Sequence, residues 1–184
     1  MLADYHVIVL CGFMGCGKTT VGKALARRLG WEFIDMDSWI EQQAGASVSE
    51  IFEIRGEPAF RALEREACRT LAQRSRCVIA SGGGALTFAE NVQTFRAAQC
   101  PIVLLDVPLD VILLRLRSDT TRPLLQRPDK AQAARRLYDA RLPLYRAAAS
   151  LTIAGGNSPA QTARRIAEEL QARAALFCSE AEVR

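Results

Sequence analysis

The chain has 184 residues, of which 49% are apolar and 24% charged, and its formal net charge is +4. This length and composition suit one globular domain with its own core and are short for two. The basic residues form no dense run with interleaved aromatic rings, which argues against a nucleic-acid binder. No apolar run approaches the roughly 18 residues of a membrane span.

The N-terminus and the cysteines favour a cytoplasmic protein. The first ten residues, MLADYHVIVL, have no basic start and no cleavage-like site, so we expect them to be structure and not a targeting signal. The six cysteines include no Cys-x-x-Cys pair and there is one histidine, which argues against a zinc site or a disulfide framework. We expect reduced thiols that fill the core. Cys16 is the exception, because oxidation or alkylation there would block a glycine-rich loop.

The first elements predict a parallel sheet. Residues 5–10 are apolar and rich in β-branched side chains, which predicts a buried strand, and helical spacing over 18–29 predicts a helix that Gly30 ends. Residues 31–35 indicate a second strand. A strand, glycine loop, helix and strand in this order form a βαβ unit, whose strands are parallel.

The middle of the chain continues the alternation. Ser47-x-x-Glu50 is a capping box that begins a helix, and Pro58 fits the first turn of another. Residues 77–81 predict a third strand. It leads into the triplet Gly82-Gly83-Gly84.

The C-terminal part holds two more strands, three helical segments and one interruption. The expected elements are a strand at 102–106, a helix at 109–116, a helix from Ala131, a strand at 151–154 and a helix that Pro159 opens. The polar stretch at 117–130 contains two prolines and no helical period, so we interpret it as a mobile lid.

These elements predict an α/β fold, a three-layer sandwich with a five-stranded parallel sheet and with ligands at the carboxyl ends of the strands. We expect a single domain over residues 1–175, with its lid at about 117–130, followed by a C-terminal tail at 176–184.

The glycine loop predicts a triphosphate site. Gly12-x-x-x-x-Gly17-Lys18-Thr19 matches the P-loop pattern and lies between a predicted strand and helix, as the mechanism requires. Backbone N–H groups and the helix N-terminus would hold phosphates, Lys18 would reach the β- and γ-phosphates, and the Thr19 hydroxyl would bind Mg²⁺. The strings Asp-x-x-Gly and Asn-Lys-x-Asp, which a GTPase would show, do not occur.

Acidic residues end two of the predicted strands. Asp35 and Asp37 are two apart, so in an extended chain they would face the same side, beside the phosphates. There they could hold Mg²⁺ through water and accept a proton from an attacking hydroxyl. The alternative is a helix cap at Asp37 and a solvated Asp35. Asp106 resembles a Walker B acid, but Pro108 follows at once, and we expect Asp106 to end its strand or cap a turn.

Several motifs in order resemble the shikimate kinase family from about residue 5 to 170. They are the glycine loop, Phe33-Ile34-Asp35-x-Asp37-x-x-Ile40-Glu41, Ile51-Phe52-x-x-x-Gly56-Glu57-x-x-Phe60-Arg61-x-x-Glu64, the triple glycine, Arg122-Pro123-Leu124-Leu125 and Arg141-x-Pro143-x-Tyr145. The resemblance implies a nucleoside-monophosphate-kinase-like fold. It also implies transfer of the ATP γ-phosphate to the 3-hydroxyl of shikimate, in aromatic amino-acid biosynthesis.

The resemblance also implies roles for individual residues. The catalytic residues would be Lys18, Asp37 and Arg122. Shikimate would be bound by Asp37, Arg61, Gly82, Gly83, Gly84 and Arg141. ATP would be bound by Gly12, Gly15, Cys16, Gly17, Lys18, Thr19, Thr20, Arg115, Arg122 and Pro159. The metal would be held by Thr19 directly and by Asp35 through water.

Other interpretations stay open at this point. Arg61 could be a surface arginine paired with Glu57 or Glu64, and Pro143 could mark a helix end beside Arg141. The chain could be another small-molecule kinase, such as a gluconate or nucleotide kinase, or a nucleotide-binding switch that turns over slowly. We expect a cytoplasmic monomer, with neither nucleic acid nor membrane as a partner.

Overall fold

Five parallel strands form the centre of the computed structural model, in the order β2-β3-β1-β4-β5. The structure describes residues 5–117, 130–155 and 158–181. The strands are β1 (Val7–Cys11), β2 (Glu32–Asp35), β3 (Cys77–Ala80), β4 (Ile102–Asp106) and β5 (Leu151–Ala154). This sheet confirms the α/β fold predicted from the sequence, with strand ends shifted by a residue or two.

Position in the sheet explains the pattern of each strand. Every residue of β1 and β3 is buried, because helices cover both faces of the central strands. The edge strand β5 alternates buried and exposed residues, which is the pattern of a strand with one solvent-exposed face.

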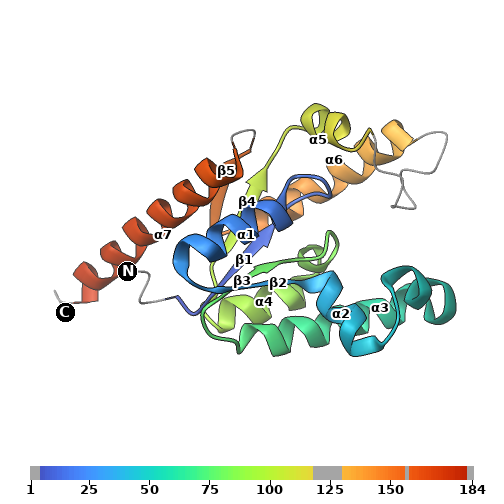
Figure 1. Ribbon diagram of the computed structural model, residues 1–184, viewed down its shortest axis with the longest axis horizontal. Helices are drawn as coiled ribbons and strands as arrows, with labels where there is room; N and C mark the ends of the chain where they lie inside the picture. Colours follow the sequence, from blue (N-terminus) through green and yellow to red (C-terminus); the bar gives the residue numbers. More distant parts are fainter. Residues whose placement is uncertain (1–4, 118–129, 156–157, 182–184) are drawn as a thin grey trace.

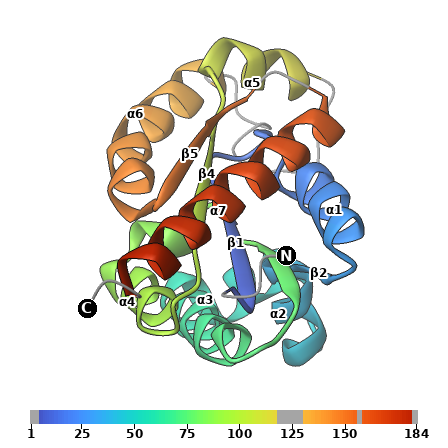
Figure 2. The same cartoon turned by 90° about the vertical axis from the view of Figure 1, so that its left-hand side faces the viewer.

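Helices cover both faces of the sheet (Figures 1 and 2). In chain order they are α1 (Lys18–Leu29), α2 (Met36–Ala44), α3 (Val48–Ala72), α4 (Ala89–Ala97), α5 (Leu109–Arg115), α6 (Lys130–Ala148) and α7 (Pro159–Ala181), with a 3₁₀ turn, η1 (Ala85–Thr87), after β3. Helices α1 and α7 pack against each other on one side, and α3, α4 and α6 lie on the other. The three layers are those that the sequence predicts.

Local signals at helix ends are confirmed. Gly30 ends α1 with φ 67°, and the capping box of Ser47 and Glu50 is complete at the start of α3. Within α3, Gly56 has φ 75° and ψ 172°, so the segment is two helices joined at a kink. Pro58 lies in the first turn of the second of them, where its missing N–H costs no helical hydrogen bond.

The strand before α2 ends earlier than the sequence argument assumed. Asp35 is the last residue of β2, and Asp37 lies in the first turn of α2, so the extended-chain reasoning for this pair is wrong. The buried pair Met36 and Ile40, four residues apart, explains the helix, since this spacing gives α2 an apolar face. A helix cap at Asp37 is also wrong, because the N-cap residue is Asp35.

Four further elements differ from expectation. The sequence reading missed η1 and α4, and the structure continues α7 beyond residue 175, to Ala181. Helix α6 runs through Pro143 to Ala148, although a proline interior to a helix removes one hydrogen bond. Buried packing of Tyr145 and Ala148 explains why the helix does not end there.

The thiols of the described residues fill the core as predicted, and Cys16, which the sequence analysis set apart because it lies in the glycine loop, is buried as well. Five cysteines among the described residues, Cys11, Cys16, Cys68, Cys77 and Cys100, are free and buried. Burial raises the pKa of the Cys11, Cys68 and Cys77 thiols to about 12. In the part of the chain that the structure describes, no helix has the length and apolar character to cross a membrane.

Candidate active site

The glycine loop curls between β1 and α1. Gly12 has φ 140°, and a β-carbon there would lie 2.9 Å from the backbone oxygen of Leu105, so the loop excludes side chains at this position. Lys18 Nζ donates to the backbone oxygens of Gly12 at 2.7 Å and Phe13 at 3.2 Å. The first turn of α1 follows at once, which places a helix N-terminus and a cation at one point.

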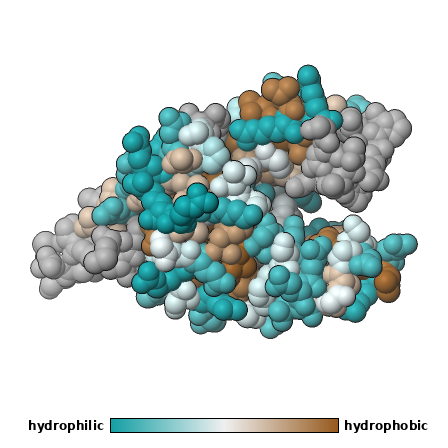
Figure 3. Space-filling view, in the orientation of Figure 1, coloured by the Kyte–Doolittle hydropathy of each residue, from teal (hydrophilic) through white to brown (hydrophobic). Residues whose placement is uncertain are grey.

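A cleft of about 510 Å³ lies beside this loop. In Figure 3 the molecule is hollowed between the part that holds α2 and α3 and the part that holds α5 and α6. The cleft is lined by the predicted residues Gly15, Cys16, Gly17, Lys18, Thr19, Thr20, Asp35, Asp37, Gly83, Arg115 and Pro159. The glycine loop, both acidic residues and part of the triple glycine therefore share one cavity.

Other predicted residues border the cleft without lining it. They are Gly12, Arg61, Gly82, Gly84 and Arg141. Arg122 and most of the predicted lid lie outside the described residues.

The two metal-ligand candidates, Thr19 and Asp35, lie together at the N-terminus of α1. Thr19 Oγ1 donates to Asp35 Oδ2 at 2.9 Å. A hydroxyl and a carboxylate oxygen at this distance are hard ligands of the kind that Mg²⁺ prefers. The residues present therefore fit a magnesium ion beside the phosphate loop.

Three charged side chains from α2 and α3 pack against the triple glycine. A β-carbon at Gly82 would lie 2.6 Å from Asp37 Oδ1 and 3.0 Å from Glu64 Oε1, and one at Gly84 would lie 2.7 Å from Arg61 Nη1. Glycine is therefore required here for close approach. The turn after β3 brings α2 and α3 to one edge of the cleft.

Arg61 is held by two carboxylates. Its Nη1 donates to Glu64 Oε2 at 2.5 Å, and its Nη2 and Nε donate to Glu57 Oε1 at 2.7 and 3.1 Å. These are the ion pairs that a surface arginine would make. The Arg61 side chain is nonetheless only 16% exposed, and it stacks near the rings of Phe60 and Phe88. The arginine is thus ordered beside the glycine turn.

Glu64 is a site residue that the residue-by-residue prediction left out. Its side chain is 1% exposed. Burial raises the pKa of its carboxyl, the hydrogen bond and charge of Arg61 oppose this, and the nearby Asp37 adds to it. Burial acts to lower the pKa of Arg61, but its bonds to Glu64 and Glu57 raise it overall. The signal in the sequence was the spacing of Arg61 and Glu64, one helical turn apart.

Helix α6 reaches the same turn from the opposite side. Arg141 Nη1 donates to the backbone oxygen of Gly83 at 3.1 Å, and the Tyr145 hydroxyl donates to the same oxygen. Because α6 continues through Pro143, these two residues lie one turn apart on one face. Arg141 therefore contacts the glycine turn from α6, and its charge acts to lower the pKa of Glu64.

Two of the predicted residues reach the cleft from α5 and from the start of α7. Arg115 Nη1 donates to the backbone oxygen of Cys16 at 3.2 Å, and Pro159 lines the cleft at the start of α7. Asp106 behaves as predicted for a residue that ends its strand, since its carboxylate pairs with Arg146 at 2.9 Å. It does not line the cleft.

The sequence matches the family model described as shikimate kinase over residues 14–171. A shikimate kinase of Psychrobacter arcticus is 37% identical over 184 residues, which cover 100% of this chain and 96% of that protein. A shikimate kinase of Geobacter sulfurreducens is 48% identical over 143 residues, 78% of each.

Solved structures agree with the sequence match. A shikimate kinase from Acinetobacter baumannii in complex with shikimate superposes with a TM-score of 0.86 at 38% identity, over 92% of this chain and 95% of that one. A gluconokinase from Sinorhizobium meliloti shares only the fold, with a TM-score of 0.63 at 17% identity. Together with the cleft, these matches show that the chain belongs to the shikimate kinase family and is an ATP-dependent phosphotransferase.

Proposed function

We propose that the chain transfers the γ-phosphoryl group of ATP to the 3-hydroxyl of shikimate in the cleft described above. The observation that carries this proposal is the meeting of Asp37, Arg61 and the triple glycine at one edge of a cleft whose other edge is the phosphate loop. One edge suits a triphosphate and the other a small polyhydroxylated carboxylate.

The nucleotide would lie along the glycine loop. Backbone N–H groups and the N-terminus of α1 would hold the phosphates, and Lys18 would exchange its bonds to Gly12 and Phe13 for bonds to phosphate oxygens. Arg115 and Pro159 would flank the adenine, with Arg115 leaving the loop carbonyl that it now contacts.

Thr19 and Asp35 would hold Mg²⁺, Thr19 directly and Asp35 through water. The ion, when bound, would neutralise charge on the β- and γ-phosphates. The hydrogen bond between the two side chains already keeps both oxygens at the phosphate end of the cleft.

Asp37 would act on the acceptor. It lines the cleft and packs against Gly82, so a ring lying on the glycine turn would present a hydroxyl to its carboxylate. Asp37 would orient that hydroxyl and take its proton as the oxygen attacks the phosphorus atom.

Arg61 and Arg141 would bind the carboxylate of shikimate. Glu64 is buried and stays paired with Arg61, whereas Glu57 is 61% exposed and its ion pair contributes little. The substrate carboxylate would therefore replace Glu57 on the guanidinium fork, in a bidentate contact that arginine favours. Arg141 would approach from α6.

Three parts of the proposal rest on the sequence. Arg122, which lies outside the described residues, would contact the phosphates as an arginine finger supplied within the chain. We also propose that the protein works as a monomer and in the cytoplasm. The free, buried thiols among the described residues suit a reducing compartment.

The test is ADP release measured with ATP and Mg²⁺ in the presence of shikimate, gluconate, a nucleoside monophosphate or no acceptor. We expect turnover with shikimate alone, and a product in which phosphate sits on the 3-hydroxyl by NMR. Turnover with gluconate or a nucleoside monophosphate would favour another small-molecule kinase. Slow hydrolysis that no acceptor accelerates would favour a switch.

A further inference from the structure

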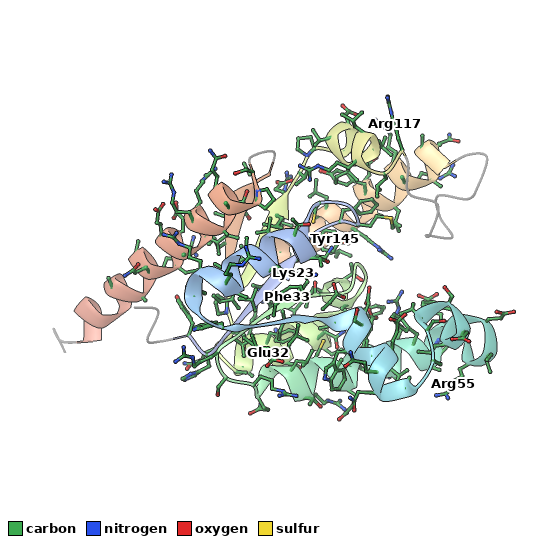
Figure 4. All side chains as sticks on the ribbon, viewed as in Figure 1. Lys23, Glu32, Phe33, Arg55, Arg117 and Tyr145 are labelled. Atoms are coloured by element: carbon green, nitrogen blue, oxygen red, sulfur yellow. The ribbon has the colours of Figure 1, made fainter. Side chains whose placement is uncertain are left out.

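One buried hydroxyl near the cleft has no part in the proposed transfer. Tyr145, on α6, is 1% exposed and donates its phenol hydrogen to the backbone oxygen of Gly83. Figure 4 labels it near the centre of the molecule. Burial raises the pKa of this phenol to about 12, so it remains a neutral donor at physiological pH.

The Gly83 oxygen differs from the other two carbonyls of the glycine turn. The Gly82 oxygen accepts from Ala85 N at 3.3 Å, and the Gly84 oxygen accepts from Thr87 N and Oγ1 at 3.1 and 2.7 Å. Those donors belong to η1, which follows the turn directly. In the described part of the chain, Gly83 alone of the three is held by a separate element, α6.

The orientation of the Gly83 peptide depends on these hydrogen bonds from α6. Three consecutive glycines have no β-carbons to limit their dihedral angles, so contacts must select the orientation of the peptide. Arg141 Nη1 supplies one contact at 3.1 Å, but a substrate carboxylate would compete for this guanidinium. The hydroxyl of Tyr145 is neutral, so the substrate carboxylate would not compete for it. Its hydrogen bond to the Gly83 oxygen would therefore remain when shikimate binds.

We infer that Tyr145 is a positioning residue for the acceptor substrate. Its hydroxyl fixes the Gly83 peptide beneath the acceptor ring and, through the shared oxygen, fixes the guanidinium of Arg141. The inference rests on the proposed function, in which Arg141 and the glycine turn bind shikimate.

The test is steady-state kinetics of Tyr145→Phe, which keeps the buried ring and removes the hydroxyl. Loss of one neutral hydrogen bond predicts a rise of about three- to tenfold in the KM for shikimate. The KM for ATP should stay unchanged. If Tyr145 served only the stability of the fold, its substitution would not change the KM for shikimate without also changing the KM for ATP.

Tyr138→Phe is the matched control. Tyr138 also lies on α6 and donates to a backbone oxygen, that of Val107, at 3.1 Å, away from the glycine turn. Its ring would keep the edge-on contact with Phe13. This variant should leave the KM for shikimate at the wild-type value.

A double variant tests the route through Arg141. In an Arg141→Ala background, Tyr145→Phe should raise the KM for shikimate by less than it does alone, because part of its effect passes through the missing guanidinium. The inference would be overturned if Tyr145→Phe left the KM for shikimate unchanged, or if it raised the KM for shikimate and the KM for ATP equally. This holds whether or not the Tm falls. A wild-type chain without shikimate-dependent ADP release would instead refute the proposed function.

Discussion

The two walls of the cleft are built in different ways. The wall that we propose to bind the nucleotide, the nucleotide wall, comes mainly from the loop at residues 12–20. In this short stretch, backbone conformation and a helix N-terminus supply most of the groups. The wall that we propose to bind the acceptor, the acceptor wall, joins residues from α2, α3, the end of β3 and α6: Asp37, Arg61, the triple glycine and Arg141. A local motif forms the first wall, and long-range packing forms the second.

The charges of the two walls also differ. On the nucleotide wall, Lys18 and Arg115 donate to neutral backbone oxygens, which phosphates and the base can replace. On the acceptor wall, Arg61 is already paired with the buried carboxylate of Glu64 and the exposed carboxylate of Glu57. Substitutions on the nucleotide wall should therefore impair nucleotide binding or phosphoryl transfer, and substitutions on the acceptor wall should leave nucleotide binding intact.

Lys18→Ala should have the largest effect. Loss of the cation at the transferred phosphate should lower kcat by about 10³-fold or more. The Tm should change little, since the hydrogen bonds of Lys18 Nζ, to the carbonyls of Gly12 and Phe13 and to Cys16 Sγ, lie within its own loop. Lys23→Ala is the control, because Lys23 lies on the same helix over the ring of Phe33 (Figure 4) and outside the cleft beside the glycine loop. Wild-type kcat in Lys18→Ala would show that the loop is not the phosphate site.

Asp37→Asn should come next, with kcat lowered by about 10²-fold or more through loss of the proton acceptor. Nucleotide affinity, measured by titration, should be retained, because Asp37 packs against Gly82, at the edge of the cleft proposed for the acceptor. Asp35→Asn should instead raise the Mg²⁺ concentration needed for half-maximal rate. Equal losses of nucleotide binding and kcat in Asp37→Asn would mean that this residue belongs to the nucleotide wall.

Arg61→Ala and Arg141→Ala should each raise the KM for shikimate by about ten- to a hundredfold, the value of a charge-assisted hydrogen bond. The KM for ATP should move little. Their effects should not add, since both would hold one carboxylate. Arg65→Ala removes an exposed ion pair with Glu90 and should leave both KM values unchanged. The assignment fails if an analogue without the carboxylate is equally sensitive to either change.

Glu64→Gln should have the smallest effect, seen in the pH dependence of the Tm. The folded-state pKa of Glu64 is raised above the ordinary 4.5 by burial, so its contribution to stability is present below about pH 4.5 and declines as pH rises through the folded-state pKa. The Tm of the wild type relative to Glu64→Gln should thus be higher at about pH 4 than at about pH 7. The control Glu57→Gln removes the exposed partner of the same arginine and should shift the Tm less. A Tm difference that grows with pH would mean that Glu64 is stabilised in its charged form.

The sequence by itself determined the glycine loop and the chain order of the five strands, although it did not reveal η1 or α4. A phosphate loop needs glycines, a lysine and a threonine at fixed spacing, so its chemistry is contained in adjacent residues such as Gly12, Gly17 and Lys18. Strand patterns and helix ends are local as well, which is why Gly30 and the Ser47–Glu50 capping box behave as predicted. For the acceptor wall, the sequence offered candidates only through resemblance to a family.

The tertiary structure decided which candidates meet and how they are held. Asp37 reaches the cleft from a helix and not from an extended strand, because Met36 and Ile40 bury a helical face. Helix α6 survives Pro143 because buried packing around Tyr145 outweighs one lost hydrogen bond, and this brings Arg141 to Gly83. The burial of Glu64, and with it the fixed place of Arg61, depends on neighbours far away in the chain. Burial and charge pairing of this kind arise only when distant segments pack, so no local pattern encodes them.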